Sequence, residues 1–133
     1  MFATLFVLLF VSHLLSDYPF QTDHQASHKA ARTATGWIAN GVHAGTHVVT
    51  TAAALLLGWA ALDLSLSLPV AAAGLLWIGV SHSFIDRRWA VAWWMQHTGQ
   101  QEFVKHGGAA HVDQAAHMGA LLLASLGMAA ATI

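Results

Sequence analysis

Four pairs of histidine and aspartate residues stand inside apolar stretches of the sequence, with four positions from one member of a pair to the other. Residues spaced this way lie on one face of a helix, so each pair can present two side chains to one ion. The helical HExxH zinc motif uses the same spacing. An ionisable side chain within a membrane span costs about 2.5–3.5 kcal/mol near the centre and usually marks function. We call these eight residues the His/Asp set: His13 and Asp17, His43 and His47, His82 and Asp86, and Asp113 and His117.

A single histidine in an apolar helix is more often a packed and hydrogen-bonded residue than a metal ligand. The set differs from that case because all four apolar segments carry a pair. From the composition we expect one such pair in about one segment in five, so four out of four is roughly a one-in-a-thousand coincidence. The pattern therefore favours metal binding, and a hydrogen-bonded or proton-relay network is the alternative.

The number and type of these side chains indicate more than one ion. Five imidazoles and three carboxylates exceed the four positions of a tetrahedral site, so we expect two divalent transition-metal ions. Mixed nitrogen and oxygen ligands suit zinc, manganese, iron or nickel and do not choose among them. Zinc is the ion we expect, with manganese or iron as alternatives. The chain has no cysteine, which excludes a thiolate site. Asp17 and Asp86 are the candidate catalytic bases.

The composition predicts that these residues lie in a membrane protein. The chain has 133 residues, 56% of them hydrophobic and only 8% charged, whereas soluble domains contain about 25% charged residues. A helical span needs roughly 20 apolar residues. The first segment lacks the positive start of a signal peptide, so we expect it to be retained. We predict one all-α transmembrane domain over 1–133, with four helices at 1–16, 37–62, 69–85 and 111–133.

The basic residues predict the orientation of the four helices. Every Lys and Arg lies in the loops 17–36 and 87–110, which four spans place on the same side. The positive-inside rule makes that side cytoplasmic, so both termini are expected outside a bacterial cytoplasmic membrane. At 1.5 Å per residue, all four pairs then fall in one layer near the cytoplasmic face. The tryptophan-rich stretch 87–97 is expected to lie in the interface.

The chain also contains an internal repeat. The segment VSHLLSDYPF at the end of the first predicted span matches VSHSFIDRRW at the end of the third. His13 and Asp17 precede His82 and Asp86 by 69 positions, and the pairs of the second and fourth spans are 70 positions apart. Two helical hairpins of the same orientation, at about 1–62 and 69–133, are therefore expected. They imply a pseudo-twofold axis along the membrane normal.

Polar residues in the two basic loops and at the start of the fourth predicted helix are candidates for binding a substrate. They border the face that carries the His/Asp set, and arginine can hold a phosphate or carboxylate through two hydrogen bonds. The alternative is ordinary positive-inside flanking. The near-neutral pI of 6.8 gives no indication of nucleic-acid binding. The candidate substrate-binding residues are Gln21, Lys29, Arg87, Arg88 and Gln114.

These motifs resemble a known group of proteins. HLLSDYPFQ, the following Lys29, the mid-chain histidine pair, HSFID and DQAAH are similar to small bacterial and phage membrane proteins grouped as domain of unknown function 3307. SHSFID is also similar, more distantly, to a motif of inner-membrane metal-dependent hydrolases of the YdjM type. The resemblance draws attention to Lys29 and Gln114 but carries no assigned reaction. It implies a shared metal site at His13, Asp17, His82, Asp86, Asp113 and His117.

The expected function is a dinuclear metal-dependent hydrolase that acts on a membrane lipid or lipid-linked ester, such as a phosphoester, at the cytoplasmic leaflet. Three alternatives remain open: a di-iron membrane oxidoreductase, a metal-ion or proton transporter or channel, and a scaffold with a structural metal site. Small residues beside the ligands, such as Gly41 and Gly45, allow close helix packing within one chain or in a homo-oligomer.

Overall fold

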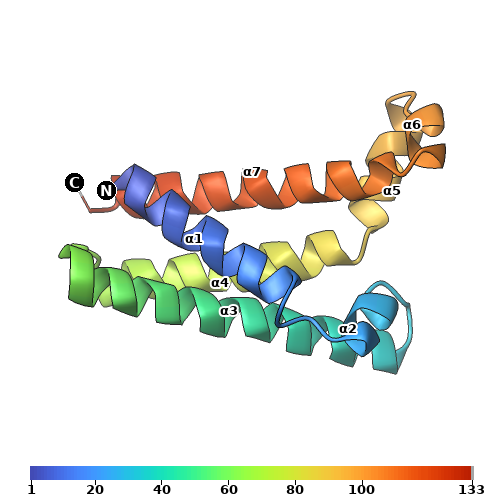
Figure 1. Ribbon diagram of the computed structural model, residues 1–133. Helices are drawn as coiled ribbons and strands as arrows, with labels where there is room; N and C mark the ends of the chain where they lie inside the picture. The colour runs from blue at the N-terminus through green and yellow to red at the C-terminus, as the bar shows by residue number, and fades with distance from the viewer. Residues whose placement is uncertain (133) are drawn as a thin grey trace.

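The computed structural model describes residues 1–132, and its regular structure there is entirely helical (Figure 1). The prediction of an all-α chain is confirmed. Residues 1–132 form four long helices and three short ones, and the short helices lie at the end of the molecule opposite the termini. The elements are α1 (Phe2–Asp17), α2 (Asp23–His28), α3 (Ala34–Leu62), α4 (Leu68–Asp86), α5 (Trp89–His97), α6 (Gln101–Lys105) and α7 (Gly108–Ala130).

The four long helices form a bundle in which each has two neighbours. α1 packs against α3 and α7, and α4 packs against the same two helices, so α1 and α4 lie diagonally opposite each other. The chain termini and the α3–α4 turn share one end of the bundle, whereas α2, α5 and α6 gather at the other (Figure 1). This neighbour pattern is the one expected if a twofold axis relates the α1–α3 hairpin to the α4–α7 hairpin.

The helix ends nearest α2 and α5 are defined by local sequence signals. Thr22 caps α2 through a capping box with Gln25, and the Thr33 hydroxyl accepts a hydrogen bond from the backbone of Gly36 at the start of α3. α4 ends at Asp86, and two residues later Arg88 adopts a left-handed conformation with φ of 61°. The chain therefore turns sharply into α5 directly after the last residue of α4.

The interior of the bundle changes character along its length. Near the termini it is apolar, while hydrogen-bonded polar residues hold the helices together farther along. Ser16 and Thr50 share a hydrogen bond of 2.5 Å between α1 and α3, and the Asn40 side chain donates to the carbonyl of Ser83 at 3.1 Å. The main buried residues of the apolar part are Leu5, Leu9, Leu55, Leu64, Ile78, Leu121, Ala124 and Met128.

The outer surface is more apolar than the polar half of the interior. Val49, Leu57 and Leu76 are each 68% exposed, whereas His43 and His47 are at most 1% exposed. Within residues 1–132, α3 and α4 are long and apolar enough to cross a membrane. α1 has only 16 residues, and the first turns of α7 carry several polar residues of the site. Length and composition thus support two of the four predicted spans.

Candidate metal centre

The structure brings all eight residues of the His/Asp set together in the half of the bundle nearest α2 and α5. α1 and α4 contribute their pairs from the last turns of the helix, and α3 and α7 contribute theirs from earlier turns. The spacing within each pair places both side chains on the face that points into the bundle. Seven of the eight are buried, and Asp113 is partly exposed.

The carboxylate of Asp17 lies at the centre of the first group of candidate ligands. Its Oδ1 atom is 3.1 Å from His43 Nε2, 3.1 Å from His47 Nε2 and 3.7 Å from His82 Nε2. Its Oδ2 atom is 3.1 Å from His13 Nε2. Four of these residues, Asp17, His43, His47 and His82, each offer a ligand atom within 4.8 Å of the others. They form one candidate position for an ion.

The carboxylate of Asp86 organises a second group. Its Oδ2 atom is 3.0 Å from His82 Nε2 and 3.4 Å from His43 Nε2, and its Oδ1 atom is 3.5 Å from His117 Nε2. His117 also lies 3.6 Å from Asp113. Asp86, Asp113 and His117 satisfy the same 4.8 Å criterion, as do His13, His82 and His117. The groups share His82 and His117, so the candidate ion positions are adjacent.

Unpartnered atoms in the set fit a cation better than a network of hydrogen bonds alone. The Nε2 atoms of His13, His82 and His117 are buried and make no hydrogen bond within residues 1–132, as is also true of Asp86 Oδ2. Their short contacts with carboxylates lack hydrogen-bond geometry. A buried polar atom without a partner costs about 1–3 kcal/mol. These atoms would ligate divalent ions, and the three carboxylates would balance most of the positive charge of two such ions.

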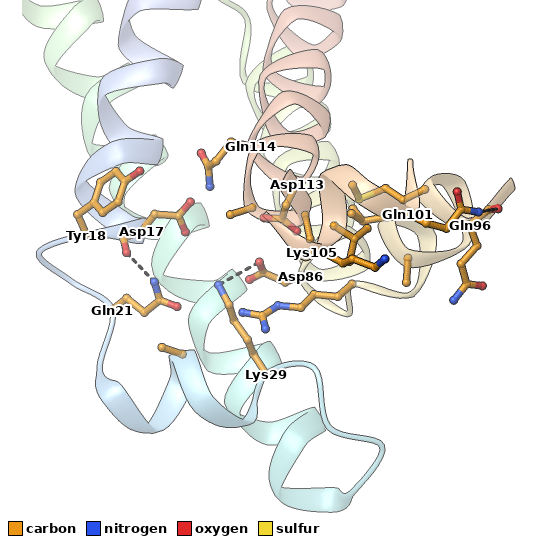
Figure 2. Close-up of a pocket in the computed structure, with 18 residues that line it drawn as sticks. Asp17, Tyr18, Gln21, Lys29, Asp86, Gln96, Gln101, Lys105, Asp113 and Gln114 are labelled. Atoms are coloured by element: carbon orange, nitrogen blue, oxygen red, sulfur yellow. Dashed lines mark hydrogen bonds and ion pairs between the residues drawn. The ribbon is translucent and has the colours of Figure 1, made fainter. Parts of the chain in front are cut away.

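A cavity of about 890 Å³ adjoins the His/Asp set (Figure 2). We call it the polar cavity. The three carboxylates of the set line it together with cationic and amide side chains from α5, α6, α7 and the α1–α3 connection. Figure 2 shows Lys29 reaching Asp86, while the Gln21 side chain donates to the backbone carbonyl of Asp17 at 2.5 Å. Its charged and amide residues are Asp17, Asp86, Asp113, Lys29, Arg88, Lys105, Gln21, Gln96, Gln101 and Gln114.

The structure separates the five predicted substrate-binding residues into two groups. Gln21, Lys29, Arg88 and Gln114 line the polar cavity. Arg87 does not; its guanidinium donates to the carbonyl oxygens of Lys29 and Ala31 on the loop after α2 and is only 2% exposed. Arg87 follows Asp86 in the sequence, but the turn after α4 directs its side chain toward the start of α3.

Two of the four glutamines that line the cavity, Gln96 and Gln101, were not predicted from the sequence. Gln96 and Gln101 lie on either side of the α5–α6 connection and line the cavity. Both lie in the tryptophan-rich loop predicted at 87–110, and their positions have no periodic relation to the His/Asp pairs. No pattern in the sequence therefore connected these glutamines with the site. The only available signal was the prediction that this loop lies on the side of the bundle that carries the set.

Comparison with known proteins identifies a family but no activity. The family described as a protein of unknown function, DUF3307, matches residues 5–133. The chain belongs to this family. No curated protein and no solved structure matches the chain. The resemblance to the family is therefore confirmed, whereas the relation to YdjM-type hydrolases stays a prediction. The function has to be argued from the His/Asp set and the polar cavity.

Proposed function

We propose that the chain is a membrane-embedded dinuclear metalloprotein that hydrolyses an ester, and most readily a phosphoester, of a lipid or lipid-linked substrate at the cytoplasmic face. One observation carries the proposal. Five imidazoles face two buried carboxylates, Asp17 and Asp86, at the inner end of a cavity whose wall also bears cations. This combination provides ligands for ions and a place for an anionic substrate beside them.

The two ions would be held by different parts of the His/Asp set. Asp17, His43, His47 and His82 belong to one position and Asp86, Asp113 and His117 to the other, and His13 groups with His82 and His117 between them. Two divalent ions supply, when bound, a lowered pKa for water and stabilisation of both the attacking and the leaving oxygen. These donors suit zinc, manganese or iron, and zinc is the ion that we propose.

The residues of the polar cavity would bind the substrate and handle its proton. Lys29 and Arg88 provide positive charge for a phosphate or carboxylate. The buried Gln21 Oε1 atom has no hydrogen-bond partner within residues 1–132, so it can accept from a hydroxyl of the headgroup. Gln114 offers an amide donor and acceptor on the same cavity. Asp17 or Asp86 would accept the proton of the attacking water.

The surface of the bundle supports a lipid substrate. Its outer face is apolar along α3 and α4, and both helices have the length and composition of membrane spans. We infer that α1 and α7 span the bilayer with them. By the positive-inside rule, the basic residues favour an orientation with the polar cavity on the cytoplasmic side and the termini outside. The volume of about 890 Å³ suits a headgroup of the size of a typical small-molecule ligand.

The alternatives fare differently against the geometry. A transmembrane ion path would have to pass the apolar core around Leu9, Leu55 and Leu121 near the termini, which opposes conduction. A di-iron oxidoreductase would use the same nitrogen and oxygen donors. Bound zinc or manganese would favour hydrolysis, whereas bound iron would keep the oxidoreductase as an alternative. The identity of the metal is therefore the first quantity to measure.

We expect about two transition-metal ions per chain in protein purified in detergent, because the eight donors exceed what one ion accepts. A variant with His13→Ala and His82→Ala should lose both ions, since His82 contacts the two central carboxylates and His13 contacts one of them. Mass spectrometry of the metals in the purified chain measures the stoichiometry.

The matched control uses another histidine pair with the same spacing. His24 and His28 stack on each other on α2, outside the His/Asp set. A variant with His24→Ala and His28→Ala should keep the full metal content. Wild-type protein that remains free of metal after reconstitution with zinc, manganese and iron would contradict the proposal. The set would then be a proton or hydrogen-bond network.

The membrane topology can be tested with single cysteines because the chain has none of its own. Cysteine at Ser65 in the α3–α4 turn and at Thr132 beyond α7 should react with an impermeant maleimide added outside intact cells. Cysteine at Gln101 in α6 should react only after permeabilisation. Equal reactivity at Gln101 and Thr132 would show that α7 does not cross the bilayer, and equal reactivity at all three would contradict a spanning protein.

A further inference from the structure

The side chain of Arg87 is enclosed by contacts that connect the end of α4 to the loop between α2 and α3. Its Nη1 atom donates to the carbonyl of Lys29 at 3.0 Å and its Nη2 atom donates to the carbonyl of Ala31 at 2.7 Å. The guanidinium also lies over the ring of Trp37 at 3.9 Å and over that of Trp89 at 4.7 Å. Arg87 therefore joins two regions that are distant in the sequence, 29–37 and 87–89.

The loop held by Arg87 carries the ammonium group closest to the His/Asp set. Lys29 Nζ lies 3.0 Å from Asp86 Oδ1, and the Lys29 side chain is only 9% exposed. The loop packs tightly against the start of α3, where a Cβ at Gly36 would collide with the carbonyl oxygen of Ala31. The position of the Lys29 backbone, and hence the reach of its side chain, depends on this packing.

The chemistry of arginine explains why this residue type stands at position 87. Its planar guanidinium can donate to two carbonyl oxygens at once while its faces stack on aromatic rings, which a lysine ammonium cannot do. Lysine, by contrast, has a flexible four-carbon side chain and loses considerable rotamer freedom when it is fixed. With a mobile backbone, the Lys29 ammonium would be held less firmly beside Asp86 than it is when the backbone is fixed.

We propose that Arg87 is a positioning residue that fixes the Lys29 ammonium at the inner end of the polar cavity, where it receives the anionic group of the substrate. The backbone clamp is visible in the contacts of Arg87, and the assignment to Lys29 of an anion-binding role rests on the proposed function. Asp86 and Arg87 are consecutive in the sequence. The same turn of the chain therefore positions both Asp86, a member of the His/Asp set, and Arg87, which holds the neighbouring Lys29.

Chemical labelling tests the clamp without requiring metal or substrate. The chain has two lysines, Lys29 and Lys105, and the Lys105 side chain is 67% exposed. In the wild type, an amine-reactive reagent should modify Lys29 at least about tenfold more slowly than Lys105, because reaction requires local opening. Arg87→Met should raise the ratio of Lys29 to Lys105 labelling about tenfold, as read by peptide mass spectrometry.

Two further variants give the control and the discriminating case. Arg32 also lies over Trp89, at 4.7 Å, but makes no hydrogen bond to the loop within residues 1–132, so Arg32→Met should leave the labelling ratio unchanged. Arg87→Lys keeps the charge and should behave like Arg87→Met. Retention of Lys29 protection in Arg87→Met would overturn the clamp, and rescue by Arg87→Lys would show that charge rather than geometry matters.

Binding of inorganic phosphate to the zinc-loaded protein tests the functional half. Lys29→Met and Arg87→Met should each weaken phosphate binding about tenfold by calorimetry, since each removes or displaces a charged donor. If Arg87 acts through Lys29, the double variant should be no weaker than Lys29→Met alone. Additive losses would overturn the positioning role, provided that helical content and zinc stoichiometry match the wild type.

The two readouts separate failure of this inference from failure of the proposed function. Zinc-loaded wild-type protein that binds no phosphate would refute the anion site, and the labelling ratio would still decide whether Arg87 fixes Lys29. Normal phosphate binding in the wild type with unchanged binding in Arg87→Met would refute the role of Arg87 and leave the metal site intact.

Discussion

Replacing Asp17 with asparagine is expected to remove most of the metal-dependent chemistry of the chain. Asparagine has nearly the same shape as aspartate but no negative charge, and the Asp17 carboxylate lies within 3.1–3.7 Å of four imidazoles. We expect zinc affinity to fall at least about a hundredfold, beyond what loss of an outer-shell partner costs. Hydrolysis of a test substrate such as bis(p-nitrophenyl) phosphate should fall at least about a thousandfold.

Asp113→Asn serves as the matched comparison. The Asp113 side chain is 20% exposed and its contact within the set is with His117 at 3.6 Å, so we expect a smaller loss of affinity than for Asp17→Asn. Metal titration and the hydrolysis rate measure both variants under the same conditions. Full metal content and an unchanged rate in Asp17→Asn would mean that this carboxylate neither binds an ion nor supports one that does.

Removal of the metal ions is expected to destabilise the bundle strongly. An ion present at about a thousand times its dissociation constant stabilises the folded state by about 4 kcal/mol, so two such ions would contribute about twice that. The effect should be large because the ligands come from all four long helices. Treatment with a chelator should lower the melting temperature in detergent by at least about 10 °C, as followed by circular dichroism.

The variant with His13→Ala and His82→Ala supplies the control for chelation. Without the ions its melting temperature should already be low, and the chelator should change it little. A similar chelator effect in this variant would show that the reagent acts elsewhere on the protein. No effect of the chelator on metal-loaded wild type would show that packing alone holds the four helices together.

The helices and the residues of the set were largely predictable because both depend on local periodicity. The predicted segments 37–62 and 69–85 differ from α3 and α4 by no more than three residues at either end. The i, i+4 spacing placed each His/Asp pair on one helix face, and the repeat placed the pairs at matching depths. Hydrophobic periodicity and ligand spacing are properties of neighbouring residues, so a single sequence contains them.

Contacts between distant segments could not be predicted in the same way. The position of Arg87 depends on two tryptophans and on carbonyl oxygens more than 50 residues away, and backbone carbonyls leave no mark in a sequence. The contact of Lys29 with Asp86 likewise depends on how the loop after α2 folds back. Arg87 was therefore grouped with the substrate-binding residues because of its charge and location.

Mean hydropathy is a limited guide to membrane spans in a chain of this kind. A helix that contributes ligands to a buried site has to carry polar residues, and these lower its mean hydropathy. α7 carries His111, Asp113, Gln114 and His117 in its first turns. Within residues 1–132, only α3 and α4 meet a span criterion based on length and apolarity. The polar residues that α7 contributes to the site thus account for its failure to meet that criterion.

The order of synthesis gives this arrangement a consequence for biogenesis. The ribosome completes α1, α3 and α4 before α7, and Asp113 and His117 come from α7. Chains fold from the N-terminus during translation, so the nascent three-helix intermediate would expose His82 and Asp86 along its open side. Capture of the second ion would coincide with docking of the last and most polar helix. If the chain holds two ions as proposed, a chain made without metal would lack that link between α7 and the other three helices at the last step of assembly.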